Sequence, residues 1–194
     1  MPRITDNLLT QEEHLKLKEL LESDYFPWFF QDGSAIGARQ HFSNYHFGHN
    51  FYLNDNVSSD NFNVIEPIVK NLKCHSLVRI KGNLYPAREK IYKSYLHTDQ
   101  PFACKVAIYF VNSNNGYTMI DDQKIESVAN RLVSFPASTY HFGTPCTDEK
   151  VRVVINFNYT EKLRRNESVN VVKGDGANVA LDVHYVLLFV GWVI

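Results

Sequence analysis

The chain has 194 residues, of which 44% are hydrophobic and 21% are charged, which predicts one globular domain with a substantial core and excludes a disordered or low-complexity protein. Its formal net charge of -1 provides no overall attraction for nucleic acid or for an anionic membrane surface. The 3 cysteines are an odd number without Cys-x-x-Cys spacing, which argues against a disulfide framework and against a zinc site.

Residues 1–74 are expected to supply helices that pack against the rest of the domain. The sequence TQEE at Thr10–Glu13 has the spacing of a capping box and predicts a helix that continues to about Glu22, with Leu15, Leu20 and Leu21 on its buried side. The first residues contain acids and no long apolar stretch, so we expect no secretory signal. The expected location is therefore the cytoplasm, or the host cytoplasm if the chain is viral.

A short aromatic run follows over Tyr25–Phe30, interrupted by Pro27, and it is too short to span a membrane. It is consistent with core packing and with the lining of a substrate cleft, and we favour the core. A second helix is predicted from about Asp60 to Lys73, because its apolar residues recur at helical spacing.

From about residue 75 to 160 the sequence changes to short runs rich in β-branched and aromatic residues. The runs are SLVRIKGNLY, KIYKSYLHTD, ACKVAIYFVN, GYTMI, ESVA, RLVSF and VRVVINFNY. Turns are predicted at Asn114–Gly116, Asp121–Asp122 and Asn130–Arg131. The fold class that follows is α+β and mainly β, with antiparallel strands in a sandwich or barrel behind N-terminal packing helices.

Residues 161–194 form a C-terminal extension to which we assign no function. Its last part, VALDVHYVLLFVGWVI, is strongly apolar but contains Asp182 and His184, and it is too short and too polar for a membrane helix. An additional strand and a contact in a homodimer both remain open. We treat residues 1–194 as a single domain with this extension.

Four residues stand out as candidates for chemistry. Because side chains alternate along a strand, Tyr95, His97 and Asp99 would share one face at a strand end, and His141 follows another strand. Two imidazoles and one carboxylate are a ligand set that leaves half of an octahedral iron open. Arg152 would lie on the polar face of the run VRVVINFNY, where a buried guanidinium requires an anion such as a carboxylate.

The spacing of His97-Thr-Asp99, His141 and Arg152 resembles that of the Fe(II)- and 2-oxoglutarate-dependent dioxygenases, specifically the small prolyl-4-hydroxylase-like branch of phages and marine bacteria. The resemblance extends from about Leu77 to Tyr159. The runs that carry it are NLYPAREKIYKSYLHTD, VNSNNGYTMI and ESVANRLVSFPASTYHFGTPCTDEKVRVVINFNY. The fold that it implies is a double-stranded β-helix, or jelly roll.

The resemblance also implies roles for individual residues. His97, Asp99 and His141 would bind Fe(II), and Arg152 would pair with the distal carboxylate of 2-oxoglutarate, where many members of the branch have lysine. Tyr85, and alternatively Tyr92, would contact the co-substrate. The implied reaction uses O2, releases succinate and CO2, and hydroxylates a peptidyl residue such as proline or a small molecule, with ascorbate as an additional reductant.

Several alternatives remain beside this interpretation. The chain could be a non-catalytic β-helix binding module with a vestigial metal site, although retention of all four residues favours an enzyme. Nucleic-acid demethylation is a weaker alternative, and no nucleic acid or membrane partner is expected. We expect His41, His46 and His49 to lie in a loop near the cleft entrance rather than to bind a second metal. Asn156 and Asn158 would either contact substrate or complete hydrogen bonds within the barrel, and the substrate itself is not identified.

Overall fold

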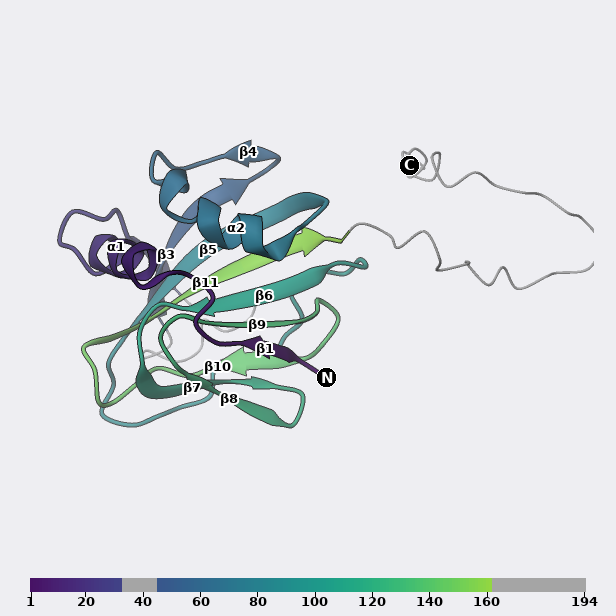
Figure 1. Ribbon diagram of the computed structural model, residues 1–194. Coiled ribbons are helices and arrows are strands. Elements are labelled where there is room, and N and C mark those ends of the chain that lie inside the picture. The colour runs from purple at the N-terminus through teal and green to yellow at the C-terminus, as the bar shows by residue number, and fades with distance from the viewer. Residues whose placement is uncertain (33–44, 162–194) are drawn as a thin grey trace, which may run out of the picture. The chain divides into compact units, whose positions relative to one another are not determined.

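Two antiparallel sheets, one of eight strands and one of three, make up most of the structure (Figure 1). This computed structural model describes residues 1–32 and 45–161, which belong to one compact unit, Met1–Lys162. His41 and nearly all of the C-terminal extension, with its predicted strand or dimer contact, therefore lie outside the described residues.

The described elements follow one another along the chain in a fixed order. They are β1 (Arg3–Thr5), α1 (Gln11–Leu21), β2 (Phe29–Asp32), β3 (Tyr45–Leu53), β4 (Asn56–Val57), a 3-10 helix (Phe62–Val64), α2 (Glu66–Leu72), β5 (Ser76–Pro86), β6 (Lys105–Phe110), β7 (Asn114–Ile120), β8 (Gln123–Ser127), β9 (Arg131–Pro136), β10 (His141–Gly143) and β11 (Val151–Thr160).

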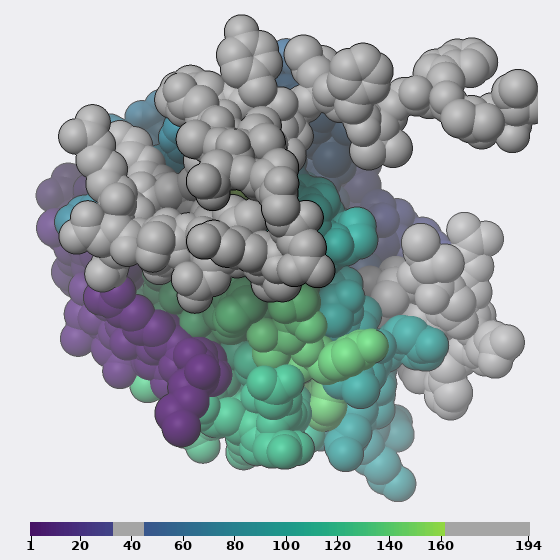
Figure 2. Space-filling model, turned by 90° about the vertical axis from the view of Figure 1, so that its right-hand side faces the viewer, coloured from purple at the N-terminus to yellow at the C-terminus, as the bar shows by residue number. Residues whose placement is uncertain are grey.

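The major sheet has the strand order β1-β9-β6-β11-β5-β3-β2, with β4 paired to β3. The minor sheet has the order β10-β7-β8. At the edge of the major sheet, the N-terminal residues, purple in Figure 2, lie against the green β9 region, to which β1 is paired. The non-sequential order is that of the jelly roll expected from the sequence.

Strand β11 lies in the middle of the major sheet, and its alternate side chains enter two separate apolar cores, one on each face of the sheet. Its residues Val153, Ile155 and Phe157 belong to a large apolar core on one face of the sheet. Val154 belongs to a second core on the opposite face, where the sheet packs against the β7 and β8 residues Ile120 and Ile125. The alternation predicted for VRVVINFNY is confirmed, because neighbouring residues of a strand point to opposite faces.

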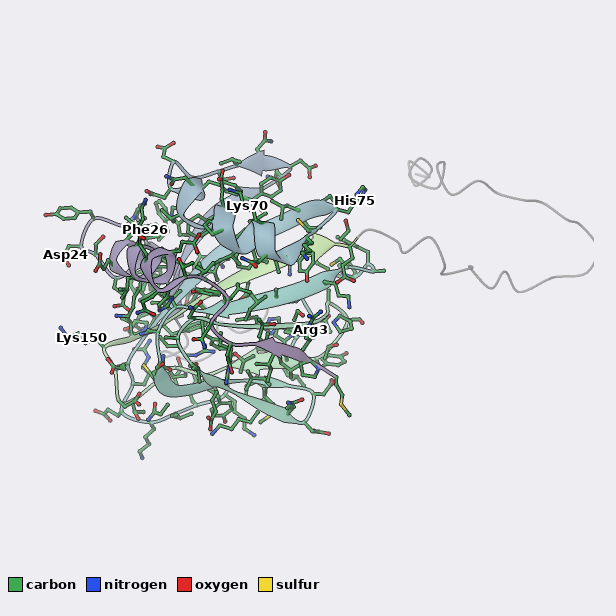
Figure 3. All side chains as sticks on the ribbon, in the orientation of Figure 1. Arg3, Asp24, Phe26, Lys70, His75 and Lys150 are labelled. Atoms are coloured by element: carbon green, nitrogen blue, oxygen red, sulfur yellow. The ribbon has the colours of Figure 1, made fainter. Side chains whose placement is uncertain are left out.

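The helices cover the face of the major sheet that carries the large core. Leu17 and Leu21 of α1 and Ile68 of α2 are buried in this core, and Phe26, labelled in Figure 3, packs with them. The capping box is confirmed, since the Thr10 hydroxyl accepts from Glu13 N at 3.3 Å and Thr10 N donates to the Glu13 carboxylate at 3.0 Å.

The expected buried side of α1 is confirmed for Leu21 and for the partly buried Leu20 but is wrong for Leu15. Leu15 is 43% exposed, whereas His14 and Leu17 are buried together with Leu21. Residues 14, 17 and 21 repeat at helical spacing, so the buried face of the helix is centred about one position away from Leu15. This face includes a polar residue, His14, which the search for leucines overlooked. The buried His14 is satisfied by a hydrogen bond between its Nδ1 and the hydroxyl of Tyr109 at 2.8 Å.

The second predicted helix is divided in two. A 3-10 turn over Phe62–Val64 precedes α2, which begins only at Glu66. Pro67 lies in the first turn of α2, the position where its missing N–H leaves no helical hydrogen bond unmade. Neither of the two described α-helices is long and apolar enough to cross a membrane.

Residues 1–74 are not purely helical, because β1, β2, β3 and β4 all come from this region. Strand β3 pairs with β5 and β2 pairs with β3, so they extend the major sheet on one side of β11. Sequence patterning missed β3 because His46, Gly48 and Asn50 interrupt its apolar residues. The boundary at residue 75 therefore does not separate a helical part from a β part.

The turns at Asp121–Asp122 and Asn130–Arg131 are confirmed, with φ of 47° at Asp121 and 62° at Asn130. Asn114–Gly116, however, does not close a strand but begins β7. A Cβ on Gly116 would lie 2.7 Å from Cδ of Arg152. The glycine is therefore required for close approach of an arginine side chain rather than for a turn.

Candidate metal centre

His97, Asp99 and His141 converge although they come from different segments. His141 begins β10, and His97 pairs with it through an isolated bridge with N–H to O distances of 3.1 and 2.9 Å. The predicted strand KIYKSYLHTD is wrong, because residues 87–104 form no regular strand apart from this bridge. The backbone of this segment is held to the chain after β9, where Asp99 N donates to Ala137 O at 3.2 Å.

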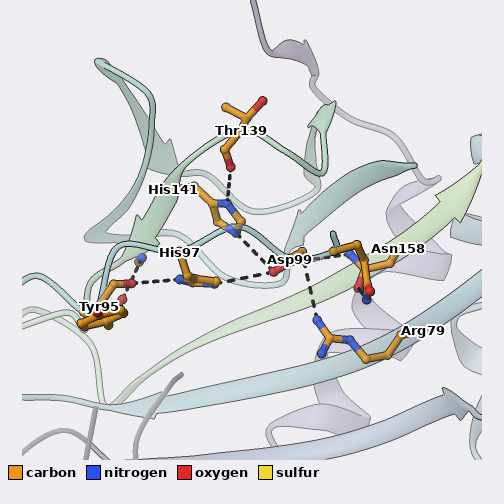
Figure 4. A network of polar contacts seen from close by, with 10 residues as sticks. Arg79, Tyr95, His97, Asp99, Thr139, His141 and Asn158 are labelled. Carbon is orange, nitrogen blue, oxygen red and sulfur yellow. Dashed lines mark hydrogen bonds and ion pairs between the residues drawn. The ribbon is translucent and has the colours of Figure 1, made fainter. Parts of the chain in front are cut away.

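The side chains of the three residues could hold a metal ion. Nε2 of His97 lies 3.6 Å from Oδ1 of Asp99, and Nε2 of His141 lies 3.5 Å from the same oxygen (Figure 4). One ligand atom from each residue lies within 4.8 Å of the other two. The sequence therefore identified three residues that the fold does bring together.

The hydrogen bonds of the two imidazoles favour metal binding. Nδ1 of His97 donates to the carbonyl oxygen of Tyr95 at 2.9 Å, and Nδ1 of His141 donates to that of Thr139 at 3.0 Å (Figure 4). In the neutral rings this leaves a lone pair on each Nε2, aimed at the carboxylate. Nε2 of His141 is buried without a hydrogen-bond partner among the described residues. Three electron-rich atoms that face one point fit a divalent cation.

Asp99 is held in its charged form. Its side chain is 3% exposed, and burial alone would raise the pKa, but the close imidazoles of His141 and His97 lower it well below the usual range. The other oxygen, Oδ2, accepts from Nδ2 of Asn158 at 2.8 Å and lies 3.7 Å from Nη2 of Arg79. These two partners fix the carboxylate so that Oδ1 faces the histidines. Of the two roles considered for Asn158, the geometry therefore supports hydrogen bonding inside the barrel.

Arg152 is a buried guanidinium without a carboxylate partner among the described residues. It is 1% exposed, its Nε donates to the Ser127 hydroxyl, and its Nη2 donates to the Thr118 hydroxyl, both at 2.8 Å. Burial lowers its pKa to about 10. A buried cation whose hydrogen bonds reach only hydroxyl groups is costly unless an anion joins it, and the planar guanidinium suits a carboxylate.

A single hollow connects Arg152 with the metal-ligating group. We call it the inner hollow; its volume is about 350 Å³, at the lower end of the range for ligand sites. Asn156 also lines it, and its Oδ1 is buried without a hydrogen-bond partner among the described residues. The hollow is thus lined by groups with unmet hydrogen-bonding capacity, which indicates a site for polar ligands.

The two predicted tyrosines differ in position. Tyr85 lines the inner hollow, with its ring 5.7 Å from Cζ of Arg152, and burial raises its pKa, so its hydroxyl stays protonated and can donate. Tyr92 does not line this hollow, and its side chain is hydrogen-bonded with Arg88. Tyr85 therefore lies in the same hollow as Arg152, whereas Tyr92 does not line it.

The expected histidine loop is wrong for the two members that the structure describes. His46 and His49 both lie in β3 and are buried. His49 is a structural residue, with Nδ1 bonded to Pro27 O at 2.8 Å and Nε2 to the Ser59 hydroxyl at 2.7 Å. His46 lines the inner hollow and stacks on Tyr85, with ring centroids 5.2 Å apart.

The aromatic run is also divided between roles. Phe26 is buried in the core and Trp28 packs against it, as expected. The side chains of Phe29 and Phe30 are 60% and 61% exposed. The spacing of the aromatic residues could not separate buried from exposed rings, because the local backbone decides which rings face inward.

Four further residues of this region were not predicted from the sequence, namely Arg79, Lys81, Thr118 and Ser127. The alternation in SLVRIKGNLY could have indicated the first two, since the apolar Val78 and Ile80 separate them from their neighbours. The two hydroxyl residues carried no such signal, because their role depends on how β7 and β8 pack beneath β11.

No protein-family model and no curated protein matches this sequence. Solved structures do match. A prolyl hydroxylase from Trichoplax adhaerens, in complex with a hypoxia inducible factor peptide fragment, has a TM-score of 0.58 at 15% identity, over 82% of this chain and 83% of that chain. A Pseudomonas putida prolyl-4-hydroxylase has a TM-score of 0.52 at 14% identity, over 82% and 92%.

An oxidoreductase of the 2OG-Fe(II) oxygenase family from Burkholderia pseudomallei gives a TM-score of 0.59 at 8% identity, over 82% of this chain and 84% of that one. At these identities the likeness concerns the fold. The predicted jelly roll of the 2-oxoglutarate-dependent oxygenases, including those of prolyl-4-hydroxylase type, is thereby confirmed.

Proposed function

We propose that this protein is an Fe(II)- and 2-oxoglutarate-dependent dioxygenase that hydroxylates a peptidyl residue of the proline type or a small molecule. The observation that carries the proposal is the shared hollow, in which a histidine-aspartate-histidine group lies beside a buried arginine that has no anionic partner among the described residues. The fold supports the same conclusion, because the similar solved structures include prolyl hydroxylases.

In this proposal the chain holds iron through Nε2 of His97, Nε2 of His141 and Oδ1 of Asp99. The carbonyl oxygens of residues 95 and 139 keep both Nδ1 atoms protonated, so each Nε2 remains available as a ligand. Asn158 holds the carboxylate of Asp99 in position. Three protein ligands leave the remaining coordination positions for 2-oxoglutarate and O2.

Arg152 would bind the distal carboxylate of 2-oxoglutarate. Its Nε and Nη2 are already fixed by Ser127 and Thr118, which orients the guanidinium plane before the anion arrives. Tyr85 can add a hydrogen bond from its protonated hydroxyl. When bound, iron and 2-oxoglutarate supply oxidation of a substrate C–H bond by O2, with succinate and CO2 as co-products.

The substrate would enter over the part of the hollow that is not occupied by Arg152. The Trichoplax adhaerens structure contains a peptide fragment, which supports a peptide as one class of substrate for this chain. We retain a small molecule as the other class, because 350 Å³ is also sufficient for such a ligand.

The test is anaerobic addition of Fe(II), with ascorbate to keep it reduced, followed by 2-oxoglutarate. We expect a visible charge-transfer band from the chelated co-substrate in the unmodified protein. Arg152→Ala should raise the concentration of 2-oxoglutarate needed for the band by at least about tenfold, because a charge-assisted bond is lost, while Fe(II) still binds. His97→Ala should abolish the band.

Two outcomes would contradict the proposal. Absence of the band in the unmodified protein would reject the co-substrate assignment, and loss of iron in Arg152→Ala would make the arginine a structural residue. A band without succinate formation for any peptide or small-molecule candidate would instead support the non-catalytic binding module.

A further inference from the structure

Two cationic side chains on β5 line the inner hollow beside the metal-ligating group. In the sheet Arg79 lies opposite Asn158 and Lys81 lies opposite Asn156, so all four side chains share the face that carries the site. Arg79 reaches Asp99, as described above. Lys81 has no hydrogen bond or ion pair with any residue in the described ranges 1–32 and 45–161.

Arg79 and Lys81 also line a second depression on the same sheet. This outer hollow has a volume of about 480 Å³ and extends over β2 and β3, where Phe29, Gln31 and Asn50 line it. The two cations are the residues that the inner and outer hollows share. A molecule that reaches from the metal centre toward β2 would therefore pass both of them.

The side chain of Lys81 packs against the neighbouring strand β3. A Cβ on Gly48 of β3 would lie 2.8 Å from Cε of Lys81 and 3.4 Å from its Nζ. The end of the Lys81 side chain therefore lies against the β3 backbone at Gly48, which itself lines the outer hollow. Any larger residue at position 48 would have to displace the lysine.

The acids of the site are too few to compensate the charges of both residues. Among the described residues that line the two hollows, Asp99 is the only acid. In the loaded site, the charges of Fe(II) and Arg152 would balance those of Asp99 and the 2-oxoglutarate dianion, which leaves the charges of Arg79 and Lys81 unmatched.

Two further observations support an unmatched charge. Nε of Arg79 is buried without a hydrogen-bond partner among the described residues. Burial and then the charge of Arg79 lower the pKa of Lys81, against a smaller opposite effect of Asp99. A buried donor and a crowded ammonium group are both stabilised by an anion between them.

We propose that Arg79 and Lys81 form a subsite for an anionic group of the substrate, a carboxylate or a phosphate, at the junction of the inner and outer hollows. The substrate would then carry this anion close to the carbon that reacts. This proposal rests on the proposed function for its reaction, but the anion subsite is defined by the two hollows and is testable by binding alone.

The experiment measures dissociation constants without turnover, in anaerobic full-length protein loaded with Fe(II) and saturating 2-oxoglutarate, so that Arg152 is occupied. Each probe is a pair that differs in one charge. The free-acid arm compares N-acetylproline with N-acetylprolinamide, and the peptide arm compares capped Gly-Pro-Asp-Gly with capped Gly-Pro-Asn-Gly. Inorganic phosphate is added as a competitor for both.

We expect the anionic member of at least one pair to bind about tenfold more tightly than the neutral member, and phosphate to compete with it. Lys81→Gln should remove this preference, and Lys81→Arg should restore most of it. The matched control is Lys70→Gln on α2, an exposed lysine on the helical side of the molecule (Figure 3), which should leave the preference unchanged. The arm with the larger preference identifies an acidic peptide or a free small acid as the source of the anion.

The proposal is overturned if no anionic probe binds more tightly than its neutral partner, including the case in which none binds, or if a properly folded Lys81→Gln keeps the preference. These failures are separate from failure of the proposed function. If 2-oxoglutarate gives no charge-transfer band, a preference that depends on Lys81 would still establish the anion subsite. A normal band without any preference would reject the subsite alone.

Discussion

The two faces of β11 are built from the same ten residues of chain but bury different chemistry. One face contributes Val153, Ile155 and Phe157 to a core that is apolar and covered by helices. The other presents Arg152, Asn156 and Asn158, which are polar, are mostly buried, and have hydrogen-bonding capacity that the described protein groups do not fully use. Stability and ligand binding are thus divided between alternate residues of one strand, and a mutation can be directed at either.

The largest expected effect is a difference in the free energy of unfolding between a variant on the apolar face of β11 and a variant on its polar face. Phe157→Ala removes a fully buried ring from the apolar core, so the free energy of unfolding should fall by about 3 to 5 kcal/mol. Asn156→Ala, one position earlier, should change it by less than about 1 kcal/mol, because Oδ1 of Asn156 is already without a partner. Urea unfolding of both variants measures the difference, and similar losses would show that the site face is also needed for stability.

The second prediction uses pH and concerns His46 of β3, which lines the inner hollow beside the polar face of β11. Burial is the main cause that lowers the pKa of His46 from 6.5 to about 4. The unfolded chain therefore takes up a proton first as pH falls below 6.5, and stability should decrease between 6.5 and about 4, by up to about 3 kcal/mol, with no contribution above this window. In His46→Gln the pH dependence of unfolding in urea should be flatter. An unchanged profile would mean that His46 is accessible to protons in the folded state.

The smallest expected effect concerns Asn158, which would act on the metal ion only through Asp99. Asn158→Ala removes the 2.8 Å hydrogen bond to Asp99, so metal affinity should fall by about tenfold. Titration with Fe(II) or Mn(II) measures this change. Asn112→Ala, which removes a hydrogen bond to Val151 O at the other end of β11, is the control and should leave metal affinity intact. Equal losses in both variants would indicate a general effect of β11 rather than orientation of the carboxylate.

Where the sequence pattern reflects burial, prediction succeeded. The alternation of β11 placed Arg152 correctly because its neighbours Val151 and Val153 are apolar and point the other way. Strand β3 was missed for the opposite reason, since His46, Gly48 and Asn50, which line the inner or the outer hollow, are not apolar. Functional demands thus obscure the pattern in the strands that form the site.

The segment before Asp99 illustrates a different limit. Its apolar residues suggested a strand, but Tyr95 and Leu96 are 55% and 52% exposed and pack against no core. The backbone is instead held by single hydrogen bonds, such as Ser94 N to Gly143 O at 3.0 Å. His97 and Asp99 could be identified as candidates from their types and spacing, whereas their partners Arg79 and Asn158 depend on strand register, which a local pattern does not contain.

Gly116 has a consequence for engineering and for comparison with other chains. It does not line the inner hollow, yet its missing side chain leaves the space that Cδ of Arg152 occupies. The two positions are therefore coupled, but a Cβ at 116 would also lie 2.8 Å from the backbone oxygen of Pro145 and 2.8 Å from Oδ1 of Asn114, so a shorter cation at 152 would not by itself make room for a larger residue. An engineered shift of the guanidinium from position 116 therefore has to move the backbone at Pro145 as well.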